Sequence, residues 1–392
     1  MSRATRRSGI RIQPQPRPPQ ARQLSTLPTT RGGRTSSSDS KACSRSNSPA
    51  AQRDSQTLRL PDGRVLGFAE YGSPTGKPLF FFHGFPSSRL EANGILEIVH
   101  REDLRIIAPE RPGFGLSTFN PRHRVTDWPG DVRALAAHLG IDRFAILGGS
   151  GGAPYALACA RALPAEMLSA VGLLAPAAPW KEGGIVGVPH SARVTALMGY
   201  YWPAALRVVS AGVVGLCRWL TTTGFVARRI DGWLETMAAE GDARSASTSA
   251  SSSTSPSISP SPPETSSPPA TTAAKKPTQE TRVALLRSVF ETFRQGTAPM
   301  VRESQLLTWE GWGFALDEVR YDKVLIWHGV EDGQSPIRMV RHLARQLPHC
   351  ELRELAGETH FTLAKHLGVI LEELVPMDGE RERRAGAGEN EM

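Results

Sequence analysis

The sequence predicts an α/β protein in which a mostly parallel sheet is flanked by helices and a helical cap is inserted late in the chain. Short, nearly continuous apolar runs alternate with segments of helical composition, which is typical of strands buried on both faces of a parallel sheet. One run, residues 144–147, leads straight into a glycine-rich turn and then a helical segment. The alternation stops between residues 175 and 322, where Trp-, Tyr- and Leu-rich sequence predicts the inserted helices.

Eight segments are predicted as strands because they are short, apolar or alternating, and bounded by turn residues. An Asp-Gly turn joins the first two into a hairpin, so we expect the sheet to be mixed at this end. The last segment alternates apolar and polar residues, which favours an edge strand. The eight segments are 56–60, 65–71, 78–82, 105–109, 144–147, 170–174, 323–327 and 350–355.

Helices are expected between these strands, over residues 87–101, 127–139, 152–163, 335–347 and 361–375. The insertion is predicted to be helical over 177–240 and 280–316, above the edge of the sheet where open α/β sheets bind ligands. Between them, residues 242–279 are Ser, Thr, Pro and Ala, a composition that predicts disorder. The expected organisation is a core of 56–176 and 317–376, a cap of 177–316, and disordered tails of 1–55 and 377–392.

The net charge of +8 comes from the N-terminal tail. Residues 1–57 carry eleven Lys or Arg against Asp39 and Asp54, so the tail holds +9 and the remainder −1. A nearly neutral body gives no indication of a nucleic-acid surface. The Arg-, Ser- and Pro-rich tail has the bias of a mitochondrial transit peptide, with a plain disordered basic tail as the alternative. Without a secretory apolar region, we expect a cytoplasmic or mitochondrial matrix protein.

Two further classes of structure are not expected. The four cysteines are scattered, so their spacing implies neither a disulfide framework nor a zinc site. The segment from Met198 to Leu220 is apolar but contains Pro203, Arg207 and Arg218. A charge near the bilayer centre is costly, so a lid helix is the better interpretation and a membrane span is not expected.

The most informative motif is Gly148-Gly149-Ser150-Gly151-Gly152, which fits the G-x-S-x-G pattern of a nucleophile elbow. A strand must turn sharply into a helix with the serine at the tip, and glycines on both sides remove the Cβ clashes that would prevent the turn. The free N–H groups of the following helix then point at the serine. A glycine-rich turn without a catalytic serine is the alternative.

With four further motifs at predicted strand ends, residues 56–375 resemble the α/β-hydrolase fold superfamily with a helical cap. These motifs are 83–86 (HGFP), 108–117 (APERPGFGLS), 327–332 (WHGVED) and 357–361 (GETHF). The resemblance implies a triad in chain order, with Ser150 as nucleophile, Asp332 as acid and His360 as base. It implies an oxyanion hole formed by the backbone N–H groups of Phe85 and Gly151.

Alternatives to these assignments come from neighbouring residues. Glu331 could replace Asp332 as the acid, and Glu358 is interpreted as a loop charge beside His360. His83 and His328 are expected to be structural, at strand ends. The second of the four motifs has Glu110 where relatives of this superfamily commonly carry Asp, which leaves the local hydrogen bonding of that loop open.

The predicted function is a serine hydrolase that forms an acyl-enzyme, acts on a carboxylic ester of a small to medium apolar molecule, and needs no cofactor or metal. A serine nucleophile argues against dehalogenases and epoxide hydrolases, which use Asp. Carbon–carbon hydrolysis, perhydrolysis, or a ligand-binding protein with little turnover are the alternatives. Cap aromatics are expected to line the substrate pocket or to pack the cap: Trp180, Tyr200, Tyr201, Trp202, Trp219, Phe225, Trp233, Trp309, Trp312 and Phe314.

Overall fold

The computed structural model describes residues 53–99, 101, 103–180, 184–236 and 278–377. The chain divides into two compact units, Met1–Ser46 and Asn47–Met392, and every described residue belongs to the second. Most of the predicted N-terminal tail, nearly all of the predicted disordered insertion and most of the C-terminal tail lie outside the described residues.

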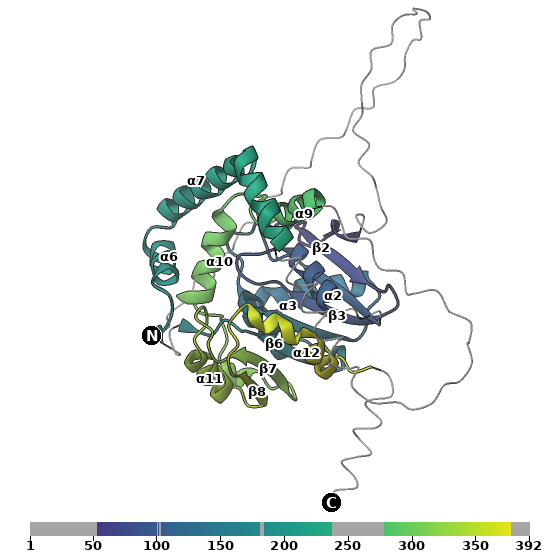
Figure 1. Cartoon of the computed structure of the whole chain (residues 1–392). Coiled ribbons are helices and arrows are strands. Elements are labelled where there is room, and N and C mark those ends of the chain that lie inside the picture. Colours follow the sequence, from purple (N-terminus) through teal and green to yellow (C-terminus); the bar gives the residue numbers. More distant parts are fainter. Residues whose placement is uncertain (1–52, 100, 102, 181–183, 237–277, 378–392) are drawn as a thin grey trace, which may run out of the picture. The chain divides into compact units, whose positions relative to one another are not determined.

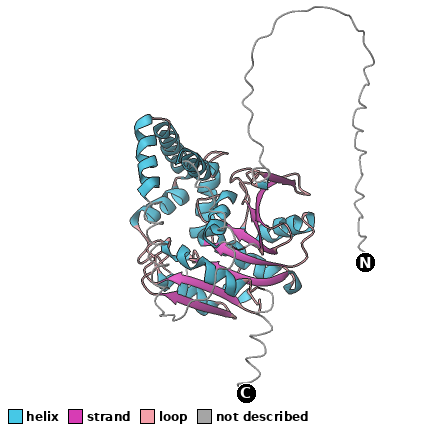
Figure 2. Cartoon of the chain, turned by 45° about the vertical axis from the view of Figure 1, so that its right-hand side comes forward, coloured by secondary structure: helices cyan, strands magenta, loops and turns pink. Residues whose placement is uncertain are grey.

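An eight-stranded sheet forms the centre of the second unit, in the order β1-β2-β4-β3-β5-β6-β7-β8. β2 runs antiparallel to both β1 and β4, and all other neighbours are parallel, which confirms the predicted mixed sheet and the edge position of the last strand. Helices cover both faces of the twisted sheet (Figure 2). The strands are β1 Gln56–Arg59, β2 Val65–Gly72, β3 Lys77–Phe82, β4 Leu104–Pro109, β5 Phe144–Gly149, β6 Leu168–Leu174, β7 Val324–Gly329 and β8 Cys350–Leu355.

The two faces of the sheet contribute to two separate hydrophobic cores, because successive side chains of a strand point to opposite faces. In β3, Phe80 and Phe82 belong to one core, and Leu79 and Phe81 belong to the other. The first core is covered by α3 Trp128–His138, α4 Ala153–Ala162 and α11 Ile337–Gln346; the second is covered by α2 Ala92–Val99 and α12 Leu367–Leu374.

The predicted core helices are present, but two begin later than the sequence indicated. The segment predicted as 87–101 opens with the 3-10 turn η1, Arg89–Glu91, before α2. The segment predicted as 361–375 opens with the 3-10 turn η6, Thr362–His366, before α12. In both places the first residues of the predicted helix belong to loops that leave the carboxyl ends of strands, and these loops carry the site described below.

The helices between β6 and β7 form the cap: α6 His190–Tyr201, α7 Pro203–Thr221, a helix over residues 224–236, α9 Thr278–Glu291 and α10 Ala298–Thr308. α6, α7 and α10 contact one another on one side of the sheet (Figure 1). The expectation of helix from residue 177 onward is wrong for residues 184–189, which contain turns. Pro189 occupies the position directly before α6, where its fixed φ is compatible with the start of a helix, and its side chain makes no capping hydrogen bond.

Candidate active site

The nucleophile elbow forms at the end of β5. Ser150 has a φ of +46°, a left-handed conformation that is uncommon outside glycine, and it opens the 3-10 turn Ser150–Gly152 that leads into α4. A Cβ on Gly152 would lie 2.2 Å from the Phe82 carbonyl oxygen, and one on Gly148 would lie 2.9 Å from the Gly152 carbonyl oxygen. Glycine is therefore required at both positions for the strand-to-helix turn to close.

His360 joins Ser150 to Asp332 through both of its ring nitrogens. Its Nε2 lies 3.1 Å from Ser150 Oγ, and its Nδ1 lies 2.7 Å from Asp332 Oδ2. Because the buried carboxylate can only accept, Nδ1–H donates to Asp332, and Nε2 is left to accept the Ser150 hydroxyl proton. The three side chains come from different loops, which follow β5, β7 and β8. The structure thus brings together the three residues that the sequence placed at strand ends.

The Asp332 carboxylate is oriented by backbone hydrogen bonds as well as by His360. Its Oδ1 accepts hydrogen bonds from the backbone N–H groups of Gln334, at 2.7 Å, and Ser335, at 2.9 Å. Burial acts to raise the pKa of Asp332, but the hydrogen bond and charge of His360 and the backbone donors outweigh it and leave the pKa below the ordinary value. Glu331, the alternative acid, is exposed, and Asp332 is the carboxylate that contacts His360.

The neighbouring histidine and glutamate have structural contacts. His328, fully buried at the end of β7, donates from Nε2 to the Ser335 carbonyl at 2.8 Å. Burial lowers the pKa of His328, so it is neutral and packs beside Asp332. Glu358 pairs with His366 at 3.0 Å, as expected of a loop charge.

The predicted oxyanion donors lie against each other beside the nucleophile. A Cβ on Gly151 would be 3.2 Å from the backbone nitrogen of Phe85, so these two backbone segments are in contact. His83, which precedes this loop, is buried; its Nδ1 donates to the Gly84 carbonyl at 2.9 Å and its Nε2 accepts from the Arg111 N–H at 3.4 Å. His83 therefore shapes the loop, as its position in the sequence indicated.

A carboxylate that sequence reasoning missed lies on the other side of this loop. Glu91, the last residue of η1, accepts the Gly84 N–H at 2.9 Å and lies close to Gly149. Burial raises the pKa of Glu91, and its hydrogen bonds to Ser87 and Gly84 only partly oppose this. Within a predicted helix of 87–101 this residue looked like an ordinary helical glutamate, and only its position eight residues after His83 hinted at the site.

Arg111 stabilises the oxyanion loop through hydrogen bonds to its backbone. Its guanidinium is fully buried and donates to the carbonyl oxygens of His83, at 2.5 Å, and Gly84, at 2.9 Å. Its Nε donates to Glu303 Oε1 at 2.7 Å. Glu303 belongs to cap helix α10 and also accepts the Tyr155 hydroxyl of α4 at 2.9 Å. One buried ion pair thus links the cap, the oxyanion loop and the helix that follows the nucleophile.

Replacing Glu303 by glutamine is expected to destabilise the protein by about 3 kcal/mol, because the buried Arg111 charge loses its counter-ion. Urea unfolding followed by circular dichroism measures this. The matched control is Glu310→Gln, which removes the ion pair with Arg302 near the end of the same helix, where Glu310 is 40% exposed. The control is expected to change the free energy of unfolding by less than about 0.5 kcal/mol. Equal effects of the two substitutions would contradict a stabilising role of the buried Arg111–Glu303 ion pair.

A second buried network settles how Glu110 is accommodated. Glu110 Oε1 accepts from Arg89 at 2.8 Å, and its Oε2 accepts from the Leu116 N–H at 2.7 Å. Arg89 also contacts Glu291 of cap helix α9 at 2.7 Å. The Arg111 loop is therefore intact with glutamate at this position, and its carboxylate forms a further tie between core and cap.

Two cavities meet at Ser150. The first, of about 320 Å³, lies under the cap, and the second, of about 610 Å³, opens between α2, η6 and the elbow. Phe85, Ser150, Gln334 and His360 line both. Cap helices supply one side of the first cavity through Ser191, Ala192, Thr195, Ala196, Ser304, Leu307 and Thr308. The second contains Glu91 among mostly apolar residues, including Phe81, Ile95, Leu363 and Leu367.

The ten aromatic residues expected to line the pocket or to pack the cap divide between these roles and the surface. Trp309 packs against Trp180 and Tyr200, and Tyr200 packs against Tyr201. Trp180 alone of the ten lines the first cavity, and Trp312 and Phe314 line a separate cavity that excludes Ser150. Six are more than half exposed: Tyr200, Tyr201, Trp202, Trp219, Phe225 and Trp233. The expectation of cap packing therefore holds for Tyr200, and Trp219, Phe225 and Trp233 lie at the surface.

Comparison with known proteins agrees with this architecture. Residues 77–190 match a family model described as alpha/beta hydrolase fold. The chain is 34% identical over 110 residues to a proline iminopeptidase of Xanthomonas citri, covering 26% of this chain and 34% of the relative. It is 30% identical over 132 residues to a non-heme haloperoxidase of Rhodococcus erythropolis, covering 33% and 47% respectively. The chain thus matches less than half the length of each of these curated relatives.

The crystal structure of an esterase from a Rhodococcus species superimposes with a TM-score of 0.50 at 18% identity, covering 82% of this chain and 99% of the esterase. Sheet order, elbow and inserted helices define a protein of the capped α/β-hydrolase class. With the match of residues 77–190 to that family model, they show that the chain has the alpha/beta hydrolase fold.

Proposed function

We propose that this chain is a serine hydrolase in which Ser150, His360 and Asp332 form the catalytic triad. The observation that carries the proposal is the position of His360, with one ring nitrogen 3.1 Å from the Ser150 hydroxyl and the other 2.7 Å from the Asp332 carboxylate. A serine hydroxyl is a weak nucleophile until a base takes its proton, and a base held in one tautomer by a buried carboxylate meets this need.

The reaction would proceed through an acyl-enzyme. Ser150 Oγ attacks the carbonyl carbon of the substrate while His360 Nε2 takes the hydroxyl proton. Negative charge develops on the carbonyl oxygen, which the N–H groups of Phe85 and Gly151 would stabilise. The leaving alcohol takes the proton from His360 as its bond to carbon breaks. Water then attacks the acyl-serine, His360 accepts a proton from it, and the carboxylic acid leaves as Ser150 regains its proton.

The first cavity supports a neutral acyl group of small to medium size. Its lining contains no carboxylate and no Lys or Arg among the described residues, and Ala177, Ala178, Leu307 and Met339 give it apolar surface. A cavity of about 320 Å³ is at the lower end of the range for small-molecule sites. We therefore propose a carboxylic ester with an apolar acyl chain as the substrate.

One observation favours a second candidate, the removal of an N-terminal residue from a peptide. Glu91 lines the second cavity beside Ser150, and a half-buried carboxylate there could accept a substrate ammonium group. The proline iminopeptidase matches are consistent with this chemistry. The ester is preferred because Glu91 already accepts the Gly84 N–H, and because burial, which raises its pKa, disfavours the charged form that an ammonium group would need.

A substrate panel tests the choice. We expect p-nitrophenyl esters of two to eight acyl carbons to be hydrolysed with a maximum of kcat/KM at short or intermediate length, and amino-acid p-nitroanilides to be cleaved at least about 100-fold more slowly. The Glu91→Gln variant should keep the ester preference. Faster cleavage of prolyl p-nitroanilide than of any ester, abolished by Glu91→Gln, would replace the esterase proposal with the aminopeptidase.

A further inference from the structure

A third cavity lies next to the first cavity and is separated from it by side chains that the two share. It has a volume of about 360 Å³ and lies between the C-terminal end of α10, the loop that follows α10, and α11. Ser150 and His360 are not among the described residues that line it. Three residues line both the first and the third cavity: Trp180, Leu307 and Thr308. These three side chains are termed the dividing wall.

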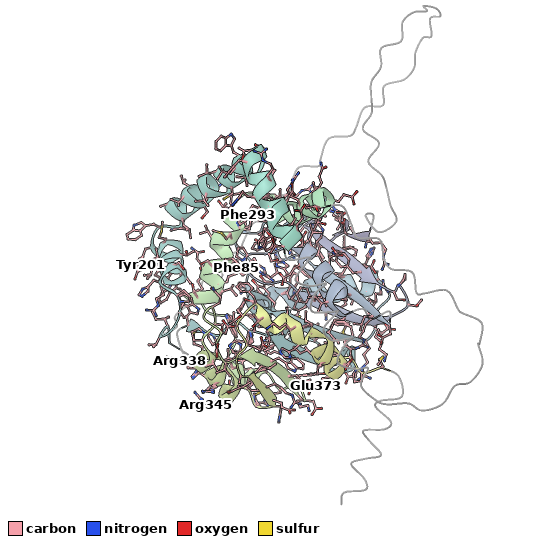
Figure 3. All side chains as sticks on the ribbon, viewed as in Figure 1. Phe85, Tyr201, Phe293, Arg338, Arg345 and Glu373 are labelled. Atoms are coloured by element: carbon pink, nitrogen blue, oxygen red, sulfur yellow. The ribbon has the colours of Figure 1, made fainter. Side chains whose placement is uncertain are left out.

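Leu307 is the part of the dividing wall that lies against the reaction centre. A Cβ on Gly151 would lie 3.3 Å from Leu307 Cδ1 and 2.6 Å from Phe85 Cβ, so Leu307 lies beside both proposed oxyanion donors. Figure 3 shows Phe85 inside the molecule, and Leu307 is 7% exposed. An acyl chain that extends from the carbonyl carbon into the first cavity therefore meets Leu307 before it can reach the third cavity.

The other two residues of the dividing wall are held by contacts within the cap. The ring of Trp180 contacts the ring of Trp309 with 6.3 Å between their centroids, and Trp309 in turn contacts Tyr200. Thr308 donates its hydroxyl to the Ser304 carbonyl at 2.6 Å, so this polar group is satisfied within α10. The dividing wall thus offers mostly apolar surface to an acyl chain.

Beyond the dividing wall, the third cavity offers further apolar surface that leads toward water. Trp312, Phe314 and Leu316 line it, and Trp312 and Leu316 are buried. Asp317 and Gln346 also line it but are exposed, so they mark the side that is open to water. A long acyl chain that passed the dividing wall would exchange water for apolar contacts along this cavity.

We propose that the dividing wall sets the upper limit of acyl-chain length, with Leu307 as the residue that stops the chain short of the third cavity. This inference rests on the proposed function, because it places the acyl group in the first cavity. Each methylene that moves from water into an apolar cavity strengthens binding about fourfold, and a chain that is stopped by the dividing wall loses this gain for every further carbon. Truncating a side chain of the dividing wall should therefore shift the preferred acyl chain to greater length.

The chain-length profile of p-nitrophenyl ester hydrolysis tests the proposal. The test variant is Leu307→Ala, and the matched control is Leu306→Ala, the same change at the preceding buried position, which lines none of the cavities described above. We expect kcat/KM of the wild type and of the control to fall steeply beyond about eight acyl carbons. In Leu307→Ala, kcat/KM for an ester of about twelve carbons, relative to the butyrate, should rise at least about tenfold. The gain should lie mainly in KM, because the added contacts are made by the chain and not by the reacting atoms.

A second pair of variants keeps the test open if Leu307→Ala does not fold. Trp180→Ala truncates the dividing wall from the cap side, and Trp202→Ala is its control, because Trp202 is 64% exposed and lines none of these cavities. Thermal unfolding establishes which variants are folded. We expect Trp180→Ala to shift the chain-length profile in the same direction as Leu307→Ala, and Trp202→Ala to keep the wild-type profile.

Binding of methyl ketones separates this inference from the proposed function, because it requires no turnover. Isothermal titration calorimetry in the Ser150→Ala background compares ketones with chains of about six and about twelve carbons, and we expect the affinity for the longer ketone to rise at least about tenfold when Leu307 is also replaced by alanine. If no ester is hydrolysed but the ketone affinities shift in this way, the proposed function fails and the dividing wall stands.

If esters are hydrolysed and the folded variants of the dividing wall keep the wild-type chain-length profile, the dividing wall is wrong and the proposed function stands. If no ester is hydrolysed, unchanged ketone affinities would overturn the dividing wall as well. A longer ketone that binds beside the shorter one without displacing it, in the presence of Leu307, would show that the third cavity is an independent site and would also overturn the proposal.

Discussion

The Ser150→Ala variant is expected to lose about 10⁴-fold or more in kcat on the best ester, and the His360→Ala variant a similar amount. Without Ser150 there is no atom at the tip of the elbow to form the acyl-enzyme. Without His360 the Ser150 hydroxyl keeps its proton, because no other base is within hydrogen-bond distance of its oxygen among the described residues. The double variant should be no slower than either single one, since the two residues act as a unit.

Both variants should fold, because alanine is smaller than the side chain that it replaces and introduces no steric clash. Steady-state kinetics with a chromogenic ester, together with thermal unfolding of each variant, separates loss of chemistry from loss of structure. A folded Ser150→Ala variant that retains more than about one tenth of the wild-type kcat would show that another nucleophile carries the reaction.

The second large effect is expected for Asp332→Asn, a loss of about 10³- to 10⁴-fold in kcat with little change in KM. An amide at this position can offer an N–H to His360 Nδ1, which favours the tautomer that carries its proton on Nε2 and cannot accept from Ser150. The amide also removes the charge that stabilises the protonated imidazole.

The neighbouring residue supplies the control. Glu331→Gln makes the same chemical change one position earlier, on an exposed side chain, and should leave kcat within about twofold of the wild type. A larger loss for Glu331→Gln than for Asp332→Asn would transfer the acid role to Glu331. Similar small losses for both would show that His360 is oriented by backbone groups alone.

Much of the core was predictable because the sequence patterns that indicate it, apolar runs and the motifs that follow them, are local. Runs such as 78–82 and 144–147 are apolar throughout, as buried parallel strands must be, and the motifs at their ends gave Ser150, Asp332 and His360 by position. The structure confirms the sheet, its mixed edge and the inserted helices. Which carboxylate meets His360 was left open by the sequence, because adjacent residues differ only in the direction of their side chains.

The parts that escaped prediction depend on long-range packing. Arg111 and Glu303 form their ion pair across 192 positions, and no local pattern connects them. For a similar reason the sequence did not decide which cap aromatics line the pocket, which pack the cap and which lie at the surface. An aromatic-rich amphipathic helix has the same sequence whether its apolar side faces a pocket, another helix or the outside. The contact of Leu206 with Gly199 of α6, and the hydrogen bonds of Thr297 to the Arg207 carbonyl and of Arg218 to the Phe290 carbonyl, fix which side of α7 is turned inward.

The most direct measurement is intact-mass labelling of the full chain with a fluorophosphonate, followed by peptide mapping. An activated serine attacks phosphorus as fluoride leaves, so the reaction reports the nucleophile and its base without knowledge of the substrate. We expect one adduct, located on Ser150, with no adduct on Ser150→Ala and at least about 100-fold slower labelling of His360→Ala. No adduct on the folded wild type, or an adduct that persists in Ser150→Ala, would contradict the assignment of Ser150 as the catalytic nucleophile.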